Sequence, residues 1–192
     1  MTTKELVAHQ RAQEAFAAVL RHVRADQLDG PTPCPGWTVR DLAHHVVGGN
    51  QRVAGSTGAP PTAGADELSE LIRAHAESAA AVQAVFAAPD GLTRTFDVPF
   101  GVIPGAVCIQ LRMADALTHA WDLAKATGQS TDLDPEVAAQ TLEVSRRLVR
   151  PDLRGPGRPF AVEQPCSPDR PVADQLAAFL GRAVTVERHL GP

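Results

Sequence analysis

Few aromatic residues, few cysteines and no surplus of basic residues characterise this sequence. Tyrosine is absent and aromatic residues make up 4% of the 192 residues, a composition that favours packed helices over an aromatic-rich β-sandwich. The formal net charge of −4 lacks the basic surplus expected of a nucleic-acid-binding protein. Cys34, Cys108 and Cys166 lie far apart with no CxxC pair, so we expect reduced thiols rather than a disulfide framework.

Long apolar runs are also missing. No run approaches the roughly 20 residues that a membrane-spanning helix needs, and the first residues lead into a charged helix rather than the apolar core of a signal peptide. We therefore expect a cytoplasmic protein that has neither a membrane nor a nucleic acid as its partner. A chain of this length can bury the core of one domain, whereas two full domains would be cramped.

What the sequence does have is helical spacing of apolar residues, interrupted by proline and glycine. We predict an all-α fold: a single domain over residues 1–192, with a bundle at about 4–128 and further helices and a connection at about 129–192. A short extended piece is expected at 92–99, and turn-rich segments at 30–36, 55–61 and 101–105. The predicted helices cover 4–24, 38 to near 55, 66–87, 105–127, 135–149 and 172–182, and a long surface connection covers 151–171.

The helix expected from residue 38 has a well-marked start. Thr38 suits the N-cap, and Asp41 three residues later completes a capping-box-like pair. Trp37, just before the cap, is expected to pack on Leu42 as a hydrophobic staple.

Two adjacent histidines on this helix differ in their helical phase. The apolar stripe consists of Leu42, Val46 and Gly49. His45 follows Leu42 by three residues and shares that inward side, whereas His44 is rotated about 100° away from it. An unpaired polar group in a core costs about 1–3 kcal/mol, so an inward His45 needs a partner, either a backbone carbonyl or a metal ion.

The helix expected at 105–127 carries a carboxylate and an imidazole one turn apart. Asp115 and His119 stand at positions i and i+4, about 6 Å apart along the axis, so both side chains can reach one ion. Spacing alone leaves two interpretations open, a solvated Asp–His pair and a ligand set at the rim of a cleft. The apolar stripe beside which the pair lies consists of Ile109, Met113, Ala116, Leu117, Ala120 and Ala124.

Two stretches, taken together, resemble a known family. Residues 32–49 read TPCPGWTVRDLAHHVVGG, and residues 115–129 read DALTHAWDLAKATGQ. They resemble actinobacterial relatives of the N-terminal domain of mycothiol-dependent maleylpyruvate isomerase, within the DinB-like metal-binding superfamily. The ending DQLAAFLGR at 174–182 resembles the end of a subfamily of these proteins. The resemblance implies a DinB-like four-helix bundle with a divalent metal at one end.

Carried onto matching positions, the resemblance implies His45, Asp115 and His119 as the metal ligands. The isomerase has glutamate where this chain has Asp115, one methylene shorter. We recognise no trace of the isomerase's separate C-terminal domain, so the maleylpyruvate reaction itself is not expected to carry over. Two imidazoles and one carboxylate leave coordination positions open, as in catalytic sites. They suit zinc first, with nickel, iron or manganese as alternatives.

The resemblance also implies thiol chemistry. A metal-bound thiol is held as the thiolate, which is the nucleophile, so the expected activity is that of a thiol transferase or isomerase that uses mycothiol on a small electrophile. A metal-dependent hydrolase that activates water and a non-catalytic metal-binding protein stay open as alternatives. The oligomeric state is open too, with a homodimer as one option.

For the remaining candidate residues, we favour interpretations that give them no role in this chemistry. Asp122, three residues after His119, either orients that imidazole or is solvated, and we favour the solvated position. Four histidines are expected to be solvated and two cysteines to be inert packing residues: His9, His22, His75 and His189, and Cys34 and Cys108.

Overall fold

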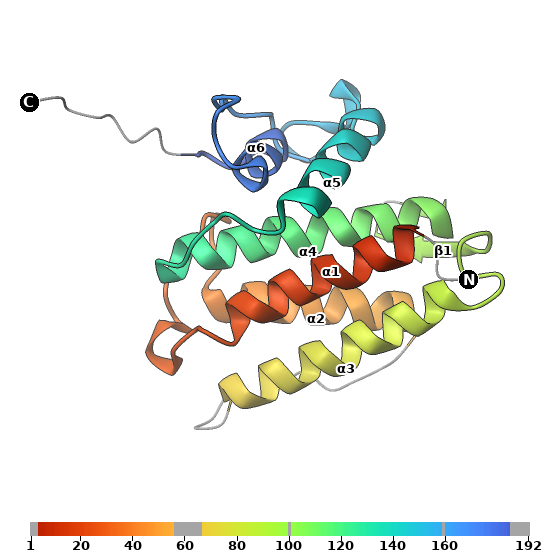
Figure 1. Ribbon diagram of the computed structural model, residues 1–192, viewed down its shortest axis with the longest axis horizontal. Coiled ribbons are helices and arrows are strands. Elements are labelled where there is room, and N and C mark those ends of the chain that lie inside the picture. The colour runs from red at the N-terminus through yellow and green to blue at the C-terminus, as the bar shows by residue number, and fades with distance from the viewer. Residues whose placement is uncertain (1–3, 56–66, 100, 159, 185–192) are drawn as a thin grey trace, which may run out of the picture.

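A four-helix bundle forms the body of the protein, for which the computed structural model describes residues 4–55, 67–99, 101–158 and 160–184. The four helices are α1 (Lys4–Leu20), α2 (Val39–Ala54), α3 (Glu67–Ala87) and α4 (Gly105–Thr127). Both α1 and α2 pack against α3 and α4, so the four helices close around one core (Figure 1). The predicted all-α bundle is confirmed.

Two further helices add a second layer on α4. These are α5 (Pro135–Leu148) and α6 (Val172–Phe179), which pack on each other and on α4, and Figure 1 shows them together on one side of the bundle. Trp121 of α4 is almost fully buried beneath them, and its indole N–H donates a hydrogen bond to Asp174 Oδ1 at 2.7 Å. Helix α4 is therefore covered on both sides, and the apolar stripe predicted for it is buried throughout.

The start of α2 follows the local sequence closely. The Thr38 hydroxyl accepts a hydrogen bond from the Asp41 amide, and Asp41 Oδ2 accepts one from the Thr38 amide, which makes the predicted capping box. Trp37 packs against the cluster that contains Leu42, as the staple prediction required. Gly55 ends the helix at a positive φ of 67°, a conformation that glycine adopts without strain.

The extended region differs from its prediction. Two antiparallel strands form there, β1 (Thr95–Val98) and β2 (Gly101–Pro104), where the sequence predicted one extended piece followed by a turn. The β-branched pair Val102 and Ile103 favours a strand, and Ile103 pairs with Phe96 beneath the core formed by α3 and α4. The sequence analysis missed this second strand because Gly101 and Pro104, on either side of the β-branched pair, are typical of a turn.

Two helix ends also differ from their predictions, and two 3-10 turns are added. Helix α1 ends at Leu20 and is followed by the 3-10 turn Ala25–Gln27, and another 3-10 turn, Pro151–Leu153, begins the predicted connection. Helix α6 ends at Phe179, three residues earlier than predicted, because Gly181 takes a positive φ of 97° that breaks the helix. The loop expected at 55–61 lies outside the described residues from 56 onward, as does residue 66.

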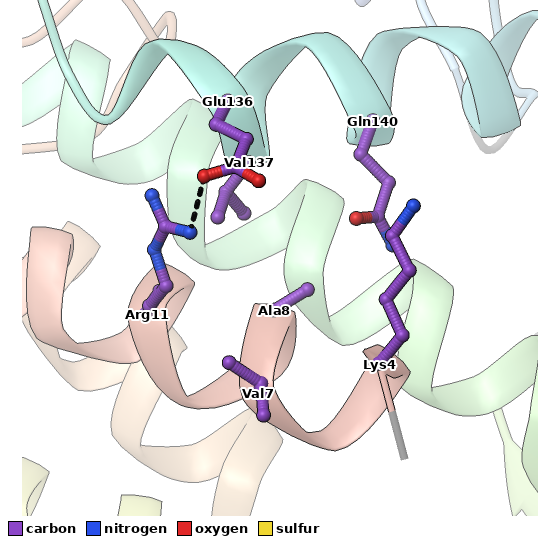
Figure 2. A pocket seen from close by; sticks show the side chains of 7 residues that line it. All are labelled: Lys4, Val7, Ala8, Arg11, Glu136, Val137 and Gln140. Atoms are coloured by element: carbon purple, nitrogen blue, oxygen red, sulfur yellow. Dashed lines mark hydrogen bonds and ion pairs between the residues drawn. The ribbon is translucent and has the colours of Figure 1, made fainter.

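A shallow hollow of about 240 Å³ lies where α1 meets α5 (Figure 2). Two of its polar lining residues are paired with each other, because the Arg11 guanidinium donates to Glu136 Oε2 as well as to both carboxylate oxygens of Asp134, the N-cap of α5. None of the residues that line it is a predicted ligand.

Within the described ranges, no helix has both the length and the apolar character needed to cross a membrane. All three cysteines are free thiols, as the sequence predicted.

Candidate metal centre

Side chains of α2 and α4 converge at one place in the bundle. His45 Nε2 lies 3.2 Å from Asp115 Oδ1, and His119 Nε2 lies 3.6 Å from the same oxygen. One potential ligand atom from each of these three side chains lies within 4.8 Å of the other two. The three residues that the sequence singled out as ligands are thus brought together.

The spacing and the chemistry of this donor set fit a divalent metal. Protein nitrogen and oxygen atoms bind zinc at about 2.0–2.2 Å, so two ligands of one tetrahedral ion lie about 3.4 Å apart. The observed separations of 3.2 and 3.6 Å bracket that value. Two imidazoles and one carboxylate form a set common to zinc and to other first-row transition metals.

The three side chains differ in depth. His119 is buried at 7% exposure, whereas the His45 side chain is 41% exposed and that of Asp115 is 22% exposed. The helical phase correctly directed His45 toward α4, but the prediction that His45 lies inside the core was wrong. The neighbouring His44 points elsewhere, with its Nε2 3.9 Å from Glu67 Oε1 of α3. The site therefore opens to solvent on the His45 side.

An aromatic ring forms one wall of the site. The Trp37 ring centroid lies 4.7 Å from that of His45 and 5.8 Å from that of His119, nearly parallel to the latter at 21°. The two imidazoles meet edge to face at 4.9 Å. Trp37 thus limits the positions of both histidine rings, a role that the staple prediction did not include.

Behind His119 lies a fully buried carboxylate. Asp122 has no exposed surface, and its Oδ2 accepts a hydrogen bond from His119 Nδ1 at 3.0 Å. Burial acts to raise the pKa of Asp122, but hydrogen bonds from His119 and Arg182 outweigh it and lower that pKa. With Nδ1 donating, Nε2 keeps its lone pair for the side facing Asp115. The favoured prediction of a solvated Asp122 was wrong, and the geometry is that of the orienting alternative.

Cys34 and Arg182 complete this outer network. Arg182 Nη2 donates to Asp122 Oδ2 at 2.8 Å and to Cys34 Sγ at 3.2 Å, and the Cys34 thiol donates to Asp122 Oδ2 at 3.1 Å. Burial, and then the charge of Asp122, raises the pKa of Cys34 to about 12. Cys34 is therefore a hydrogen-bonded thiol rather than the inert packing residue that was expected. Cys108, by contrast, is buried in an apolar cluster.

The Cys34–His119–Asp122 cluster does not form a nucleophile relay. A ligand-type atom of each of the three lies within 4.8 Å of the others, but the same nitrogen, His119 Nδ1, faces both Cys34 and Asp122. A histidine that transfers a proton between a thiol and a carboxylate uses its two nitrogens separately. The Arg182 guanidinium also fills the side where a second cation would sit.

The second oxygen of Asp115 faces a buried cation. Arg112 Nη2 forms an ion pair with Asp115 Oδ2 at 3.1 Å. Burial acts to raise the pKa of Asp115, but the charges of Arg112 and His119 and the hydrogen bond to His45 hold it well below its usual range. Asp115 is therefore a carboxylate whose Oδ2 lies in ion-pair contact with Arg112, without a hydrogen bond between them, and whose Oδ1 faces the two histidines.

Polar side chains continue from Arg112 into the bundle. Its guanidinium donates to Asn50 Oδ1, Asn50 and Gln13 exchange hydrogen bonds, and Gln13 contacts His75 Nε2 at 3.1 Å and His9 Nε2 at 3.4 Å. The last two are buried at 2% and 0% exposure, so the prediction that they are solvated was wrong. Burial lowers the pKa of each of these two histidines to about 4.

His22 and His189 are the other two histidines that were predicted to be solvated. His22 is exposed, as predicted, and His189 lies outside the described residues. A sequence signal for His9 existed, because it stands four residues before Gln13 and next to the buried positions Ala8 and Ala12 of α1. Arg112 had a local signal too, because it stands three residues before Asp115 on the same helix, whereas no such signal marked Arg182.

Comparison with known proteins gives three findings. Residues 9–124 match the family described as the mycothiol maleylpyruvate isomerase N-terminal domain. Uncharacterized proteins from two Mycobacterium tuberculosis strains, CDC 1551 / Oshkosh and ATCC 25618 / H37Rv, are each 59% identical to this chain over 179 residues, which is 93% of this chain and 98% of theirs. The crystal structure of the mycothiol-dependent maleylpyruvate isomerase matches with a TM-score of 0.57 at 17% identity, over 74% of this chain and 68% of that one. At that identity the match shows a shared fold.

Proposed function

Because this chain belongs to the mycothiol maleylpyruvate isomerase N-terminal domain family, we propose that it is a metal-dependent thiol transferase or isomerase. The proposed cosubstrate is mycothiol, and the proposed substrate is a small electrophile. The observation that carries the proposal is the convergence of His45 Nε2, Asp115 Oδ1 and His119 Nε2 at ligand spacing. Zinc is the metal that we propose first, with nickel, iron and manganese as alternatives.

Each of the three ligands has a distinct part in the proposal. His119 presents Nε2 because Asp122 holds its Nδ1 proton, and Asp115 supplies a permanently ionised oxygen because Arg112 holds the other. His45 closes the set from the solvent side. When bound there, the metal would supply the Lewis acidity that keeps a coordinated thiol in its thiolate form.

Access favours a ligand that comes from outside the protein. Three protein ligands leave at least one position open, which is the pattern of catalytic rather than structural zinc sites. Cys34 is not a competing internal ligand, because its thiol is already hydrogen-bonded to Asp122 behind His119. A small thiol would approach the metal from the exposed side of the cluster, where the His45 side chain meets solvent.

Metal analysis of untagged protein tests the site itself. We expect about one divalent ion per chain, and we expect His45→Ala, Asp115→Ala and His119→Ala each to lose most of it. His44→Ala is the matched control, because His44 is adjacent in sequence but faces Glu67. A His44→Ala protein without metal, together with a loaded His45→Ala protein, would contradict the assignment.

A conjugation assay tests the chemistry. Metal-loaded protein is incubated with a panel of small electrophiles, with and without mycothiol, and thioether formation is followed by mass spectrometry. Turnover that needs both the metal and the thiol supports the proposal. Hydrolysis of esters or amides without thiol would replace it with the hydrolase alternative. Retained metal with no turnover on any substrate would replace it with the non-catalytic alternative.

A further inference from the structure

A buried arginine determines which oxygen of Asp115 faces the two histidines. Arg112 is 9% exposed, and its Nη2 pairs with Asp115 Oδ2 at 3.1 Å, while Asp115 Oδ1 lies 3.2 Å from His45 Nε2. With Oδ2 paired, rotation of the carboxylate away from this arrangement would break an ion pair in a largely buried place. Arg112 therefore fixes the carboxylate with a single oxygen presented to the site.

The guanidinium of Arg112 is itself held from the opposite side. Asn50 Oδ1 accepts from Nη2 at 3.0 Å and from Nε at 3.3 Å, and the Val46 carbonyl accepts from Nη2 at 3.4 Å. Asn50 is fully buried and is held in turn by Gln13. All of these partners belong to α1 and α2, so the position of Arg112 on α4 is tied to the neighbouring helices.

Gly49 provides the space that this arginine needs. A Cβ built on Gly49 would lie 2.5 Å from Arg112 Nη1, 2.9 Å from Cζ and 3.0 Å from Nη2, whereas a Cβ on the adjacent Gly48 meets nothing within 4 Å. Glycine inside a helix is less favourable than alanine. At position 49 glycine is nevertheless required, because the Arg112 guanidinium occupies the space in which a side chain on residue 49 would lie.

We propose that Arg112 is a positioning residue for the metal ligand Asp115, and that Gly49 leaves the space on α2 that the Arg112 guanidinium occupies beside it. This inference rests on the proposed metal site. Partners that hold a ligating carboxylate or histidine typically contribute 10–100-fold to metal affinity. Displacing the guanidinium by one methyl group should therefore weaken metal binding, although no ligand has been changed.

The experiment compares Gly49→Ala with Gly48→Ala. Zinc affinity is measured by competition with a chromophoric chelator, and the cobalt-substituted proteins are compared by their visible absorption spectra. We expect Gly49→Ala to weaken zinc binding by at least tenfold and to change the cobalt spectrum. We expect Gly48→Ala to stay within twofold of the wild type with an unchanged spectrum. Equal affinities and spectra in the two variants would overturn the inference.

Two additional arms separate positioning from general damage. In an Asp115→Ala background, Gly49→Ala should cause no further loss of zinc affinity, and a second tenfold loss there would overturn the inference. If Gly49→Ala does not fold, Arg112→Met takes its place: it should show the same loss, and Arg112→Lys should recover part of it. An unchanged affinity in Arg112→Met would overturn the inference. A wild-type protein that binds no metal would instead remove the proposed function on which the inference rests.

Discussion

Acidification should destabilise this protein from inside the bundle, through His9 and His75. Both are buried, and burial is the main reason that the pKa of each falls from 6.5 to about 4. The charge of Arg112 lowers both further, and that of Arg21 adds to the effect on His75, while a hydrogen bond to Gln83 opposes the shift at His9. The unfolded chain therefore takes up these two protons at a higher pH than the folded chain does.

The sign and the size of the effect follow from that difference. Above about pH 6.5 neither state is protonated at these histidines, so their contribution is fully present. Between about pH 6.5 and 4 only the unfolded state binds the protons, and stability falls by up to 1.4 kcal/mol per pH unit for each histidine. From pH 6.5 to 4.5 we expect a loss of about 2 kcal/mol per histidine and about 4 kcal/mol for the pair, a large share of a typical 5–15 kcal/mol.

Urea unfolding followed by helical circular dichroism measures this loss. Each titration is run between pH 4.5 and 7.5 with a chelator present, so that metal release does not contribute. We expect His75→Gln to lose about 2 kcal/mol less than the wild type over the same interval. The control is His22→Gln, because His22 is exposed and its Nδ1 contacts the nearby Ala18 carbonyl oxygen, and its curve should run parallel to the wild type. Parallel curves for His75→Gln and the wild type would refute the reasoning.

Three further measurements test other features of the molecule. Chelation should lower the melting temperature but leave a cooperative helical transition, because apolar packing holds the core; loss of helical circular dichroism at room temperature would instead make the metal structural. Thr38→Ala should reduce the free energy of unfolding by about 1 kcal/mol, since it removes half of the capping box with Asp41; an unchanged urea midpoint would mean that packing alone fixes the start of α2. A small thiol should bind the cobalt-substituted protein with proton release and with an affinity that rises up to about pH 8.5, the free pKa of such a thiol. Calorimetry in buffers of different ionisation enthalpy checks this, and binding without proton release or without a sulfur-to-metal band would exclude the thiolate mechanism.

The helix limits were predictable where a local signal sets them. Thr38 and Asp41 cap α2 at its start, and the glycines Gly55 and Gly128 end α2 and α4 at positive φ; each of these effects depends on a few consecutive residues. The strand β2 was missed because its two β-branched residues are flanked by glycine and proline. Its stability comes from pairing with β1 and from contact with the core, and a short window of sequence shows neither.

Knowledge of the candidate site came from two different sources. Helical phase gave the direction of His45, and the family resemblance gave its partnership with Asp115 and His119. Neither source gave the burial of the His45 side chain. Helical phase defines an angle around the helix axis and not the distance of a residue from the end of the bundle. His45 therefore proved more exposed than a core residue.

Two contacts of the outer partners could not be predicted because they join residues that are distant in sequence. Arg112 meets Asn50 from 62 positions away, and Arg182 meets Asp122 from 60 positions away. No periodic pattern or capping motif connects such positions. Arg182 also lies beyond the family match, which ends at residue 124, and the resemblance of residues 174–182 to a subfamily ending assigned it no role.

The double burial of α4 has a consequence for motion. With the bundle on one side and α5 and α6 on the other, most residues of α4 are buried, so its amide protons should be among the slowest in the protein to exchange with deuterium. Asp115 and His119 are thereby attached to the segment of the chain that opens least. His45 is on α2, which exposes one face to solvent, so we expect the amide protons of α2 to exchange faster than those of α4.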